Sequence, residues 1–370
     1  MKRKVFYVLG IMSGTSIDGL DFSLIKSDGI SKVKIIENKY YKFNKKIREE
    51  INDLIKFFDL EKKFTKNEKF HRIELKFTKY VIKKIIEFLS ELNSKEKEID
   101  LIGFHGNTII HNPKKNISIQ LGNPKDIAKK INLPVVANFR KRDIENHGEG
   151  APLVPIYHKT LFSKKGKNVI VINIGGISNF TLLYGKDQLL ASDIGPGNTL
   201  IDRVSKLKFN KYFDKNGFLA SKGEINHNLI KIWMKNNILK KKKPISFDIK
   251  NFKLENFSQE KEINNLNYLR SLTYLTAKLI CKLENEIKKK IDIWIFSGGG
   301  TRNLTLMGDI KRLLKGKKVY ISDELGFDSS FIESSAFGFI SIRTIKQLPS
   351  AFPTTTGCKK KNICGEVFYP

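Results

Sequence analysis

A chain of 370 residues, 40% of them hydrophobic, can bury two cores, and it has no run of about 18 uncharged apolar residues that would cross a membrane. Its net charge of +30 comes from lysines scattered over the whole sequence, which favours a solvated basic surface and no nucleic-acid partner over the alternative of a nucleic-acid-binding protein. Three cysteines without metal-type spacing argue against a disulfide scaffold or zinc site, and the lack of a signal-peptide pattern predicts a cytoplasmic location.

The chain opens with an apolar run, followed by a segment of alternating residues, and both patterns predict β-strands. Residues 5–12, 21–26 and 33–43 are expected to pair as an antiparallel meander. Amphipathic helices are predicted next, at residues 46–58 and 67–92. The following elements are predicted as a strand at 99–104, a short helix from Asn123, a strand at 135–138 and a helix at 152–161.

The same succession restarts in the second half of the chain. Strands are expected at 168–174, 180–184, 188–192, 291–296 and 319–322, and helices at 199–206, 263–290, 304–314 and 329–345. Two β-rich starts of this kind predict an α/β fold that arose by structural duplication without a sequence repeat. We place the domains at 1–135 and 136–370, with a C-terminal tail that can return to the first. The lysine run 240–243 with Pro244 and the polar stretch 251–262 are expected to be a surface excursion without chemistry.

Four glycine turns stand beside the predicted strands, and three of them directly follow an apolar run. They span residues 13–19, 173–179, 193–198 and 297–303. Glycine lets successive backbone N–H groups close around an anion, so the turns predict a phosphate-handling site. The first turn is not a Walker loop, because no Gly-Lys-Ser/Thr follows and the next element is a strand. Ordinary glycine hairpins are the alternative.

Polar residues near strand ends are candidates for acid–base and binding chemistry. The titratable candidates are Asp193, Asp143, Glu149, Glu333, His105 and His147. Asp193, where a strand meets a glycine turn, could be a general base or the cap of the next helix. His105 and Asn107 could read sugar hydroxyls, or His105 could be structural. Arg140 could clamp a carboxylate or phosphate, and Asp18 and Asp21 could hold Mg²⁺ through waters.

Several motifs together resemble the anhydro-N-acetylmuramic acid kinase family. They occur in family order at residues 12–21, 104–108, 120–124, 138–143, 150–155 and 333–337 and in the three later glycine turns. The resemblance covers residues 10–357 and implies the two-lobed actin-like ATPase and sugar-kinase fold, with ATP in the cleft between the lobes. It also implies the reaction, in which ATP phosphorylates O6 of 1,6-anhydro-N-acetylmuramic acid while water opens the anhydro bridge, during peptidoglycan recycling.

The resemblance further implies a role for each matching residue. ATP would lie at Gly14, Thr15, Ser16, Ile17, Asp18, Gly19, Leu20, Asp21, Gly175, Gly176, Gly298, Gly299 and Gly300. Asp193 matches the catalytic aspartate that activates water, and the sugar would lie at His105, Asn107, Arg140, Asp143 and Glu333. The implied partners are ATP with Mg²⁺, whose ligands are not assigned, a small anhydrosugar, and a second copy of the chain in a homodimer.

Three positions depart from the family pattern. His147 and Glu149 stand where the family usually has Gly and Gln, and Asn107 where Gln is common. A Glu in place of Gln loses a hydrogen-bond donor, and Asn reaches less far than Gln by one methylene. A kinase of another anhydrosugar, such as levoglucosan, is therefore the alternative function.

Overall fold

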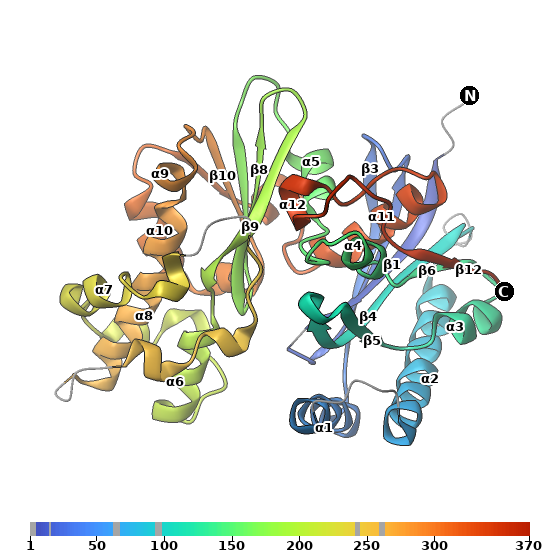
Figure 1. Ribbon diagram of the computed structural model, residues 1–370, viewed down its shortest axis with the longest axis horizontal. Helices are drawn as coiled ribbons and strands as arrows, with labels where there is room; N and C mark the ends of the chain where they lie inside the picture. The colour runs from blue at the N-terminus through green and yellow to red at the C-terminus, as the bar shows by residue number, and fades with distance from the viewer. Residues whose placement is uncertain (1–4, 15, 62–66, 93–97, 241–244, 259–262) are drawn as a thin grey trace. The chain divides into compact units, whose positions relative to one another are not determined.

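The computed structural model describes residues 5–14, 16–61, 67–92, 98–240, 245–258 and 263–370, and it confirms a mixed α/β fold (Figure 1). The chain divides into two compact units. Unit 1 consists of Met1–Leu161 together with Phe331–Pro370, and unit 2 of Phe162–Ser330. Within the described residues, no helix combines the length and apolar character needed to cross a membrane.

Unit 1 is built on a seven-stranded sheet of order β12-β6-β4-β1-β2-β3, with β5 paired to β4. Strands β1, β2 and β3 form an antiparallel meander, β4 and β6 run parallel to β1, and β12 returns antiparallel to β6. The strands are β1 (Phe6–Ser13), β2 (Gly19–Ser27), β3 (Val33–Lys42), β4 (Leu101–Asn112), β5 (Ile117–Leu121), β6 (Val135–Ala137) and β12 (Glu366–Phe368). The helices are α1 (Lys45–Glu61), α2 (Glu68–Glu91), α3 (Pro124–Ile131), α4 (Lys141–Glu145), α5 (Pro155–Phe162), α11 (Ile332–Ile345) and α12 (Pro353–Thr356).

Alternation along β1 decides what covers each face of this sheet. Leu9 and Ile11 join a core cluster with the buried side chains of α2, which recur at every third or fourth residue. Gly10 faces the other way, where a Cβ would overlap the carbonyl oxygen of Ser334. Helix α11 can therefore lie directly on the sheet, and its first turn reaches the end of β1.

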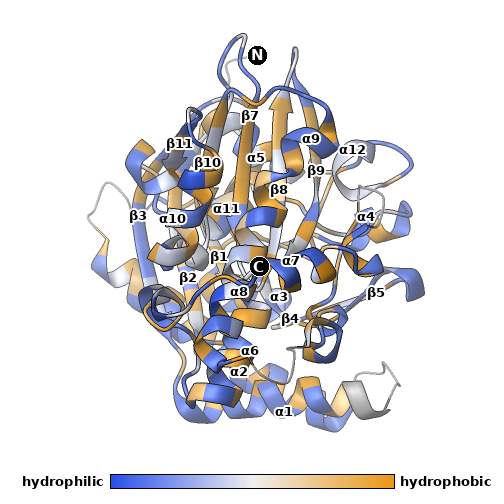
Figure 2. Ribbon diagram, turned by 90° about the vertical axis from the view of Figure 1, so that its left-hand side faces the viewer, coloured by the Kyte–Doolittle hydropathy of each residue, from blue (hydrophilic) through white to orange (hydrophobic). Residues whose placement is uncertain are grey.

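Unit 2 is built on a five-stranded sheet of order β11-β10-β7-β8-β9. Its strands are β7 (Val169–Ile174), β8 (Ile177–Tyr184), β9 (Gln188–Pro196), β10 (Ile293–Ser297) and β11 (Lys318–Ile321), and its helices are α6 (Thr199–Phe209), α7 (His227–Trp233), α8 (Asn265–Cys281), α9 (Leu283–Ile287) and α10 (Leu304–Leu313). Strand β7 is apolar along its length, as its orange colour in Figure 2 shows, and Ile170, Ile172 and Ile174 pack into a cluster with α8 and α10.

The predicted duplication is confirmed by strand order. In unit 1 the antiparallel meander β1-β2-β3 is extended, on the other side of β1, by the parallel strands β4 and β6. In unit 2 the meander β7-β8-β9 is extended in the same way, beside β7, by the parallel strands β10 and β11. The domain boundary was predicted, at element accuracy, between about residues 135 and 167, and the compact units change at residues 161 and 330. Strand β6 pairs with β4 and α11 packs on β1, which keeps both segments in unit 1.

Three predicted elements differ from the structure. The helix expected at 263–290 is divided into α8 and α9 at Lys282, and the strand expected at 188–192 continues to Pro196 and so includes Asp193. The prediction of a surface excursion is wrong for the described residues 251–258, because Phe252 and Phe257 are buried in the core of unit 2, as is Phe247 between the two predicted stretches. Residues 241–244 and 259–262 lie outside the described part of the chain.

Candidate functional site

The first glycine turn links β1 to β2 in unit 1. Its described residues are held by a hydrogen bond from Ile17 N–H to Gly14 O of 3.2 Å and by one of 2.7 Å from the Ser16 hydroxyl to Asp18 Oδ1. The side chains of Ile17 and Leu20 are buried in the core, so these residues can offer only their backbones to a ligand. Ser16 and Asp18 are exposed at the turn, and Thr15 lies outside the described residues.

Asn107 is attached to this turn. Within β4 (Leu101–Asn112), its Nδ2 donates to the Ser13 hydroxyl and to Gly14 O, both at 2.9 Å. Its Oδ1 is buried without a hydrogen-bond partner among the residues that the structure describes. Asn107 therefore fixes the start of the first glycine turn and keeps one acceptor for a ligand group.

Arg140, His105 and Glu333 form a cluster in unit 1, in which His105 is buried and the other two are half-buried. Arg140 Nε donates to His105 Nε2 at 3.1 Å, and its NH1 donates to Gly150 O at 2.9 Å. Burial, aided by the Arg140 charge, holds the pKa of His105 well below its usual value. Burial raises the pKa of Glu333, and the Arg140 charge opposes that shift. The Phe337 ring, 4.3 Å from the His105 ring, closes the cluster from α11.

Asp143 is occupied by donors from the protein itself. It is fully buried, Oδ2 accepts from Gly150 N–H at 2.8 Å, and Oδ1 accepts from the Thr356 hydroxyl at 2.8 Å and from Asn362 Nδ2 at 3.1 Å. Because Gly150 O also accepts from Arg140, Asp143 supports Arg140 through the loop between them. Sequence reasoning did not identify Thr356 or Asn362 as Asp143 partners, since they follow it by more than 200 residues.

Two of the three positions that depart from the family pattern lie on this same loop. His147 is exposed, and the half-buried Glu149 donates its backbone N–H to Thr356 O at 2.7 Å. The C-terminal segment thus contacts the loop through Asp143 and through Glu149. Neither His147 nor Glu149 belongs to the Arg140 cluster by any hydrogen bond of the described residues.

The remaining glycine turns adjoin one another in unit 2. Asn198 N–H donates to Gly175 O at 2.8 Å, and the Thr199 hydroxyl donates to Gly176 O at 2.7 Å. At the end of β10, Gly298 has φ +84°, and a Cβ there would overlap Asn173 Oδ1. The turns after β7, β9 and β10 therefore form one glycine-rich surface, as parallel strands that end at one edge of a sheet allow.

Asp193 lies on β9 in the same unit and is 9% exposed. Its Oδ2 accepts from Phe247 N–H at 2.7 Å, and its own N–H donates to Ile245 O at 2.9 Å. Helix α6 has Asn198 at its N-cap, so the alternative of Asp193 as the helix cap is wrong. The sequence analysis did not predict that the segment 245–258 contacts Asp193, although the phenylalanines at 247, 252 and 257 indicate that this segment is buried.

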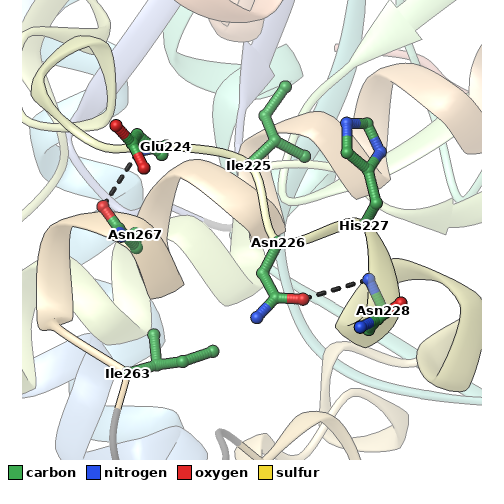
Figure 3. Close-up of a pocket in the computed structure, with 7 residues that line it drawn as sticks. All are labelled: Glu224, Ile225, Asn226, His227, Asn228, Ile263 and Asn267. Carbon is green, nitrogen blue, oxygen red and sulfur yellow. Dashed lines mark hydrogen bonds between the residues drawn. The ribbon is translucent and has the colours of Figure 1, made fainter.

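A separate hollow of about 300 Å³ opens on unit 2 and shares no residue with the predicted site. Figure 3 shows its lining side chains, which include two asparagines already used in turns and caps. Asn226 Oδ1 accepts from Asn228 N–H at 3.0 Å, and Asn267 Oδ1 accepts from Glu224 N–H at 2.9 Å. We assign this hollow a structural role.

Cys281, Cys358 and Cys364 are unpaired. No group of three or more His, Cys, Asp or Glu residues with metal-binding geometry occurs in the described part of the chain.

Comparisons with known proteins extend these observations over the whole chain. Residues 6–370 match the family model for anhydro-N-acetylmuramic acid kinase. The anhydro-N-acetylmuramic acid kinase of Rhodopseudomonas palustris strain CGA009 is 34% identical over 94% of this chain and 95% of its own. That of Pelagibacter ubique is 37% identical over 98% of each chain.

More distant similarity exists to solved structures. The activator of 2-hydroxyisocaproyl-CoA dehydratase from Clostridium difficile, with bound ADPNP, has a TM-score of 0.42 at 12% identity and covers 92% of this chain and 97% of its own. A ROK family glucokinase from Streptomyces griseus, in complex with glucose and AMPPNP, has a TM-score of 0.39 at 10% identity and covers 90% of this chain and 97% of its own.

Proposed function

This chain belongs to the anhydro-N-acetylmuramic acid kinase family, and we propose that it uses ATP to phosphorylate O6 of 1,6-anhydro-N-acetylmuramic acid while water opens the anhydro bridge at C1. The product is N-acetylmuramic acid 6-phosphate, formed in the recycling of peptidoglycan. The structural observation that carries the proposal is the position of Asp193, a buried carboxylate in the unit that also holds three adjoining glycine turns.

Asp193 is proposed to be the general base of the reaction. It takes a proton from water as the water oxygen bonds to C1, and the C1–O6 bond breaks as this bond forms. The departing O6 accepts the γ-phosphoryl group, and ADP leaves. One base therefore serves the hydrolysis and, by releasing O6, the phosphoryl transfer.

The glycine turns are proposed to bind ATP through backbone N–H groups. Residues 14–21, including Thr15, and Gly175 with Gly176 would contact the phosphates, and residues 298–300 the nucleoside. Two observations support this assignment. Gly299 is exposed, with open space where a side chain would begin, and the buried side chains of Ile17 and Leu20 leave the backbone as the part of the first turn that faces a ligand.

Asp18 and Asp21 are proposed to hold the Mg²⁺ that accompanies ATP. They offer the hard oxygen ligands that this ion prefers. Both carboxylates lie near Tyr40, whose pKa is raised to about 12 mainly by burial and then by these two charges. A divalent cation held by the two carboxylates would neutralise phosphate charge.

The Arg140 cluster is proposed to bind the sugar. Arg140 suits the lactyl carboxylate of the muramic acid, because a guanidinium binds carboxylates bidentately. His105 holds Arg140 in position, and Glu333 can accept a hydrogen bond from a sugar hydroxyl. Asn107 offers its Oδ1, which has no hydrogen-bond partner among the described residues, as a second acceptor. Asp143 acts through the loop at Gly150 rather than by direct contact, since its oxygens already accept three hydrogen bonds.

The test is product formation from 1,6-anhydro-N-acetylmuramic acid, ATP and Mg²⁺ in oxygen-18 water. We expect label in the C1 hydroxyl of a 6-phosphorylated sugar from the wild type and from the control Asp53→Asn, a change on the exposed side of α1. Asp193→Asn should bind ATP but form no labelled product. Labelled product from Asp193→Asn at the wild-type rate would remove Asp193 from the mechanism.

Substrate choice is tested with the same assay. The family comparisons support the muramic sugar rather than levoglucosan, and we expect a higher kcat/KM for the muramic form. A preference for levoglucosan would reject the assignment of Arg140 to a carboxylate.

The cytoplasmic location, the homodimer and the lack of a nucleic-acid partner stay predictions. Sedimentation equilibrium tests the dimer, and cell fractionation tests the location. Titration with duplex DNA at low and high salt tests the basic surface, because binding through phosphates would weaken steeply with salt.

A further inference from the structure

Residues 245–252 of unit 2 run alongside Asp193 and contact it twice. Asp193 N–H donates to Ile245 O at 2.9 Å, and Phe247 N–H donates to Asp193 Oδ2 at 2.7 Å. The second hydrogen bond is buried, where such a bond restricts the orientation of a carboxylate more than it does in water. We call residues 245–252 the flanking segment.

Ser192 attaches the start of the flanking segment to β9. Ile245 N–H donates to the Ser192 hydroxyl at 2.9 Å, and that hydroxyl lies 3.2 Å from Ile245 O. Ser192 is 1% exposed, so water does not compete for these groups. The residue immediately before Asp193 thereby fixes the backbone that approaches the Asp193 carboxylate.

Arg203 attaches the far end of the flanking segment to α6. Its NH1 donates to Phe252 O, and its NH2 donates to Ile249 O at 3.4 Å. Between the two attachments, the rings of Phe247 and Phe252 meet at 5.1 Å inside the core. The segment is thus held at both ends and packed in its middle.

The flanking segment also contacts the second glycine turn. A Cβ on Gly176 would lie 3.4 Å from Ile249 Cδ1, which is van der Waals contact. The same short segment therefore contacts the proposed base and a turn proposed to bind phosphate, although neither its sequence nor its length resembles a binding motif.

We propose that the flanking segment positions the Asp193 carboxylate to remove a proton from water, with Ser192 and Arg203 as positioning residues that hold the segment in place. The inference rests on the proposed function, because it assumes that Asp193 is the base. A general base has to lie within hydrogen-bond reach of the proton it removes, and a displacement of about 1 Å can cost about 100-fold in rate. Because the flanking segment is held at both ends, its Phe247 N–H stays in place and prevents that displacement of the Asp193 carboxylate.

The first experiment compares Ser192→Ala with Ser205→Ala. Both serines are buried in unit 2, but the Ser205 hydroxyl has no hydrogen-bond partner among the described residues, so Ser205 is a matched control. We expect kcat to fall by about 10- to 100-fold in Ser192→Ala, with KM for ATP and for the sugar unchanged. Ser205→Ala should keep the wild-type kcat.

A second set of variants acts on the other contacts. Phe247→Pro removes the N–H that binds Asp193 together with the ring, whereas Phe247→Leu keeps the N–H, so kcat should fall much further in the proline variant. Arg203→Met should lower kcat, and Arg203→Lys, which keeps one donor, should restore part of it. Melting temperatures of all variants identify any that lose the fold, and the Arg203 pair then decides the outcome.

The outcomes separate this inference from the proposed function. A wild type that forms no product rejects the proposed function and the inference with it. An active wild type with unchanged kcat in Ser192→Ala and Arg203→Met overturns the inference alone. A rise in KM at constant kcat also overturns it, because the segment would then serve binding. A loss of kcat confined to the Ser192, Arg203 and proline variants supports it.

Discussion

Arg140 Nε donates to His105 Nε2 at 3.1 Å, and this hydrogen bond sets the protonation state of the histidine. An Nε2 that accepts carries no proton, so the ring proton is on Nδ1, 3.0 Å from Gly106 O. The pKa of His105, well below its usual value, agrees with a neutral ring. His105 is thus an acceptor that orients Arg140, and it is not an acid in the reaction at neutral pH.

Replacing His105 should therefore weaken sugar binding through Arg140. In His105→Phe the buried Nε–H of Arg140 loses its acceptor, and a lost hydrogen bond to a charged group costs about 1.5–3 kcal/mol, so kcat/KM for the sugar should fall about 10- to 100-fold. His105→Gln keeps an acceptor and should lose less. KM for ATP serves as the internal control. Equal activity of the Phe and Gln variants would contradict the role of the acceptor.

Thr356→Val should loosen the loop that supports Arg140. The change removes one of the three donors to Asp143, and an unsatisfied buried carboxylate should lower the free energy of unfolding by about 1–3 kcal/mol. We expect a lower melting temperature and a higher KM for the sugar at unchanged KM for ATP. Thr354→Val, at an exposed position of the same helix, is the control. A similar effect of both changes would place the cause outside the Asp143 contact.

Two adjacent glycines of the turn after β10 should respond differently to alanine. Gly298 has φ +84° and no room for a Cβ, so Gly298→Ala should destabilise the fold by more than about 2 kcal/mol. Gly299 has open space around its Cα, so Gly299→Ala should keep the melting temperature. If the nucleoside lies there, the added methyl should raise KM for ATP about tenfold. Unchanged ATP affinity in Gly299→Ala would argue against this part of the proposed ATP site.

Asp202 should make stability depend on pH. Burial, and then the nearby Asp214 charge, raise the pKa of Asp202 to about 7. Between the ordinary value of 3.8 and about 7 the unfolded chain has released this proton and the folded chain has not, so the contribution to stability declines as pH rises through this range. The melting temperature of Asp202→Asn, compared with that of the wild type, should therefore rise as the pH increases from 4 to 7, and this difference should stay constant above pH 7.

The control for this titration is Asp53→Asn, which changes the net charge equally at an exposed position of α1. Thermal unfolding at pH 5, 6, 7 and 8 measures both differences. A difference between Asp202→Asn and the wild type that stays constant over these pH values would contradict the raised pKa.

Local patterns predicted most of the framework. The apolar run at residues 5–12 corresponds closely to β1, which is buried on both faces, and the spacing of apolar residues at 67–92 corresponds closely to α2, which buries one face. Strand β12 was missed because three residues carry no period, and only pairing with β6, more than 200 residues earlier, makes them a strand. Tertiary pairing of this kind has no local signal.

In the candidate site, too, residues with a local sequence signal could be predicted and contacts made by tertiary structure could not. Glycine turns and the residue Asp193 were visible in the sequence, since glycine at a strand end has a local cause. The contacts that hold Asp193 were not visible, because Phe247 contributes its backbone N–H, which every residue except proline has. Asp143 was expected to bind substrate, yet its partners Thr356 and Asn362 only meet it once the tail has folded back.

The return of Phe331–Pro370 to unit 1 also fixes an order of events during synthesis. Unit 2 is one continuous stretch, so all its residues are synthesised before Phe331–Pro370. Unit 1 therefore lacks α11, with Glu333, and the Thr356 donor to Asp143 until synthesis has passed unit 2. The glycine turns of unit 2 can thus form before the proposed sugar cluster of unit 1 is complete, and chains that stop before Phe331 should not bind the sugar.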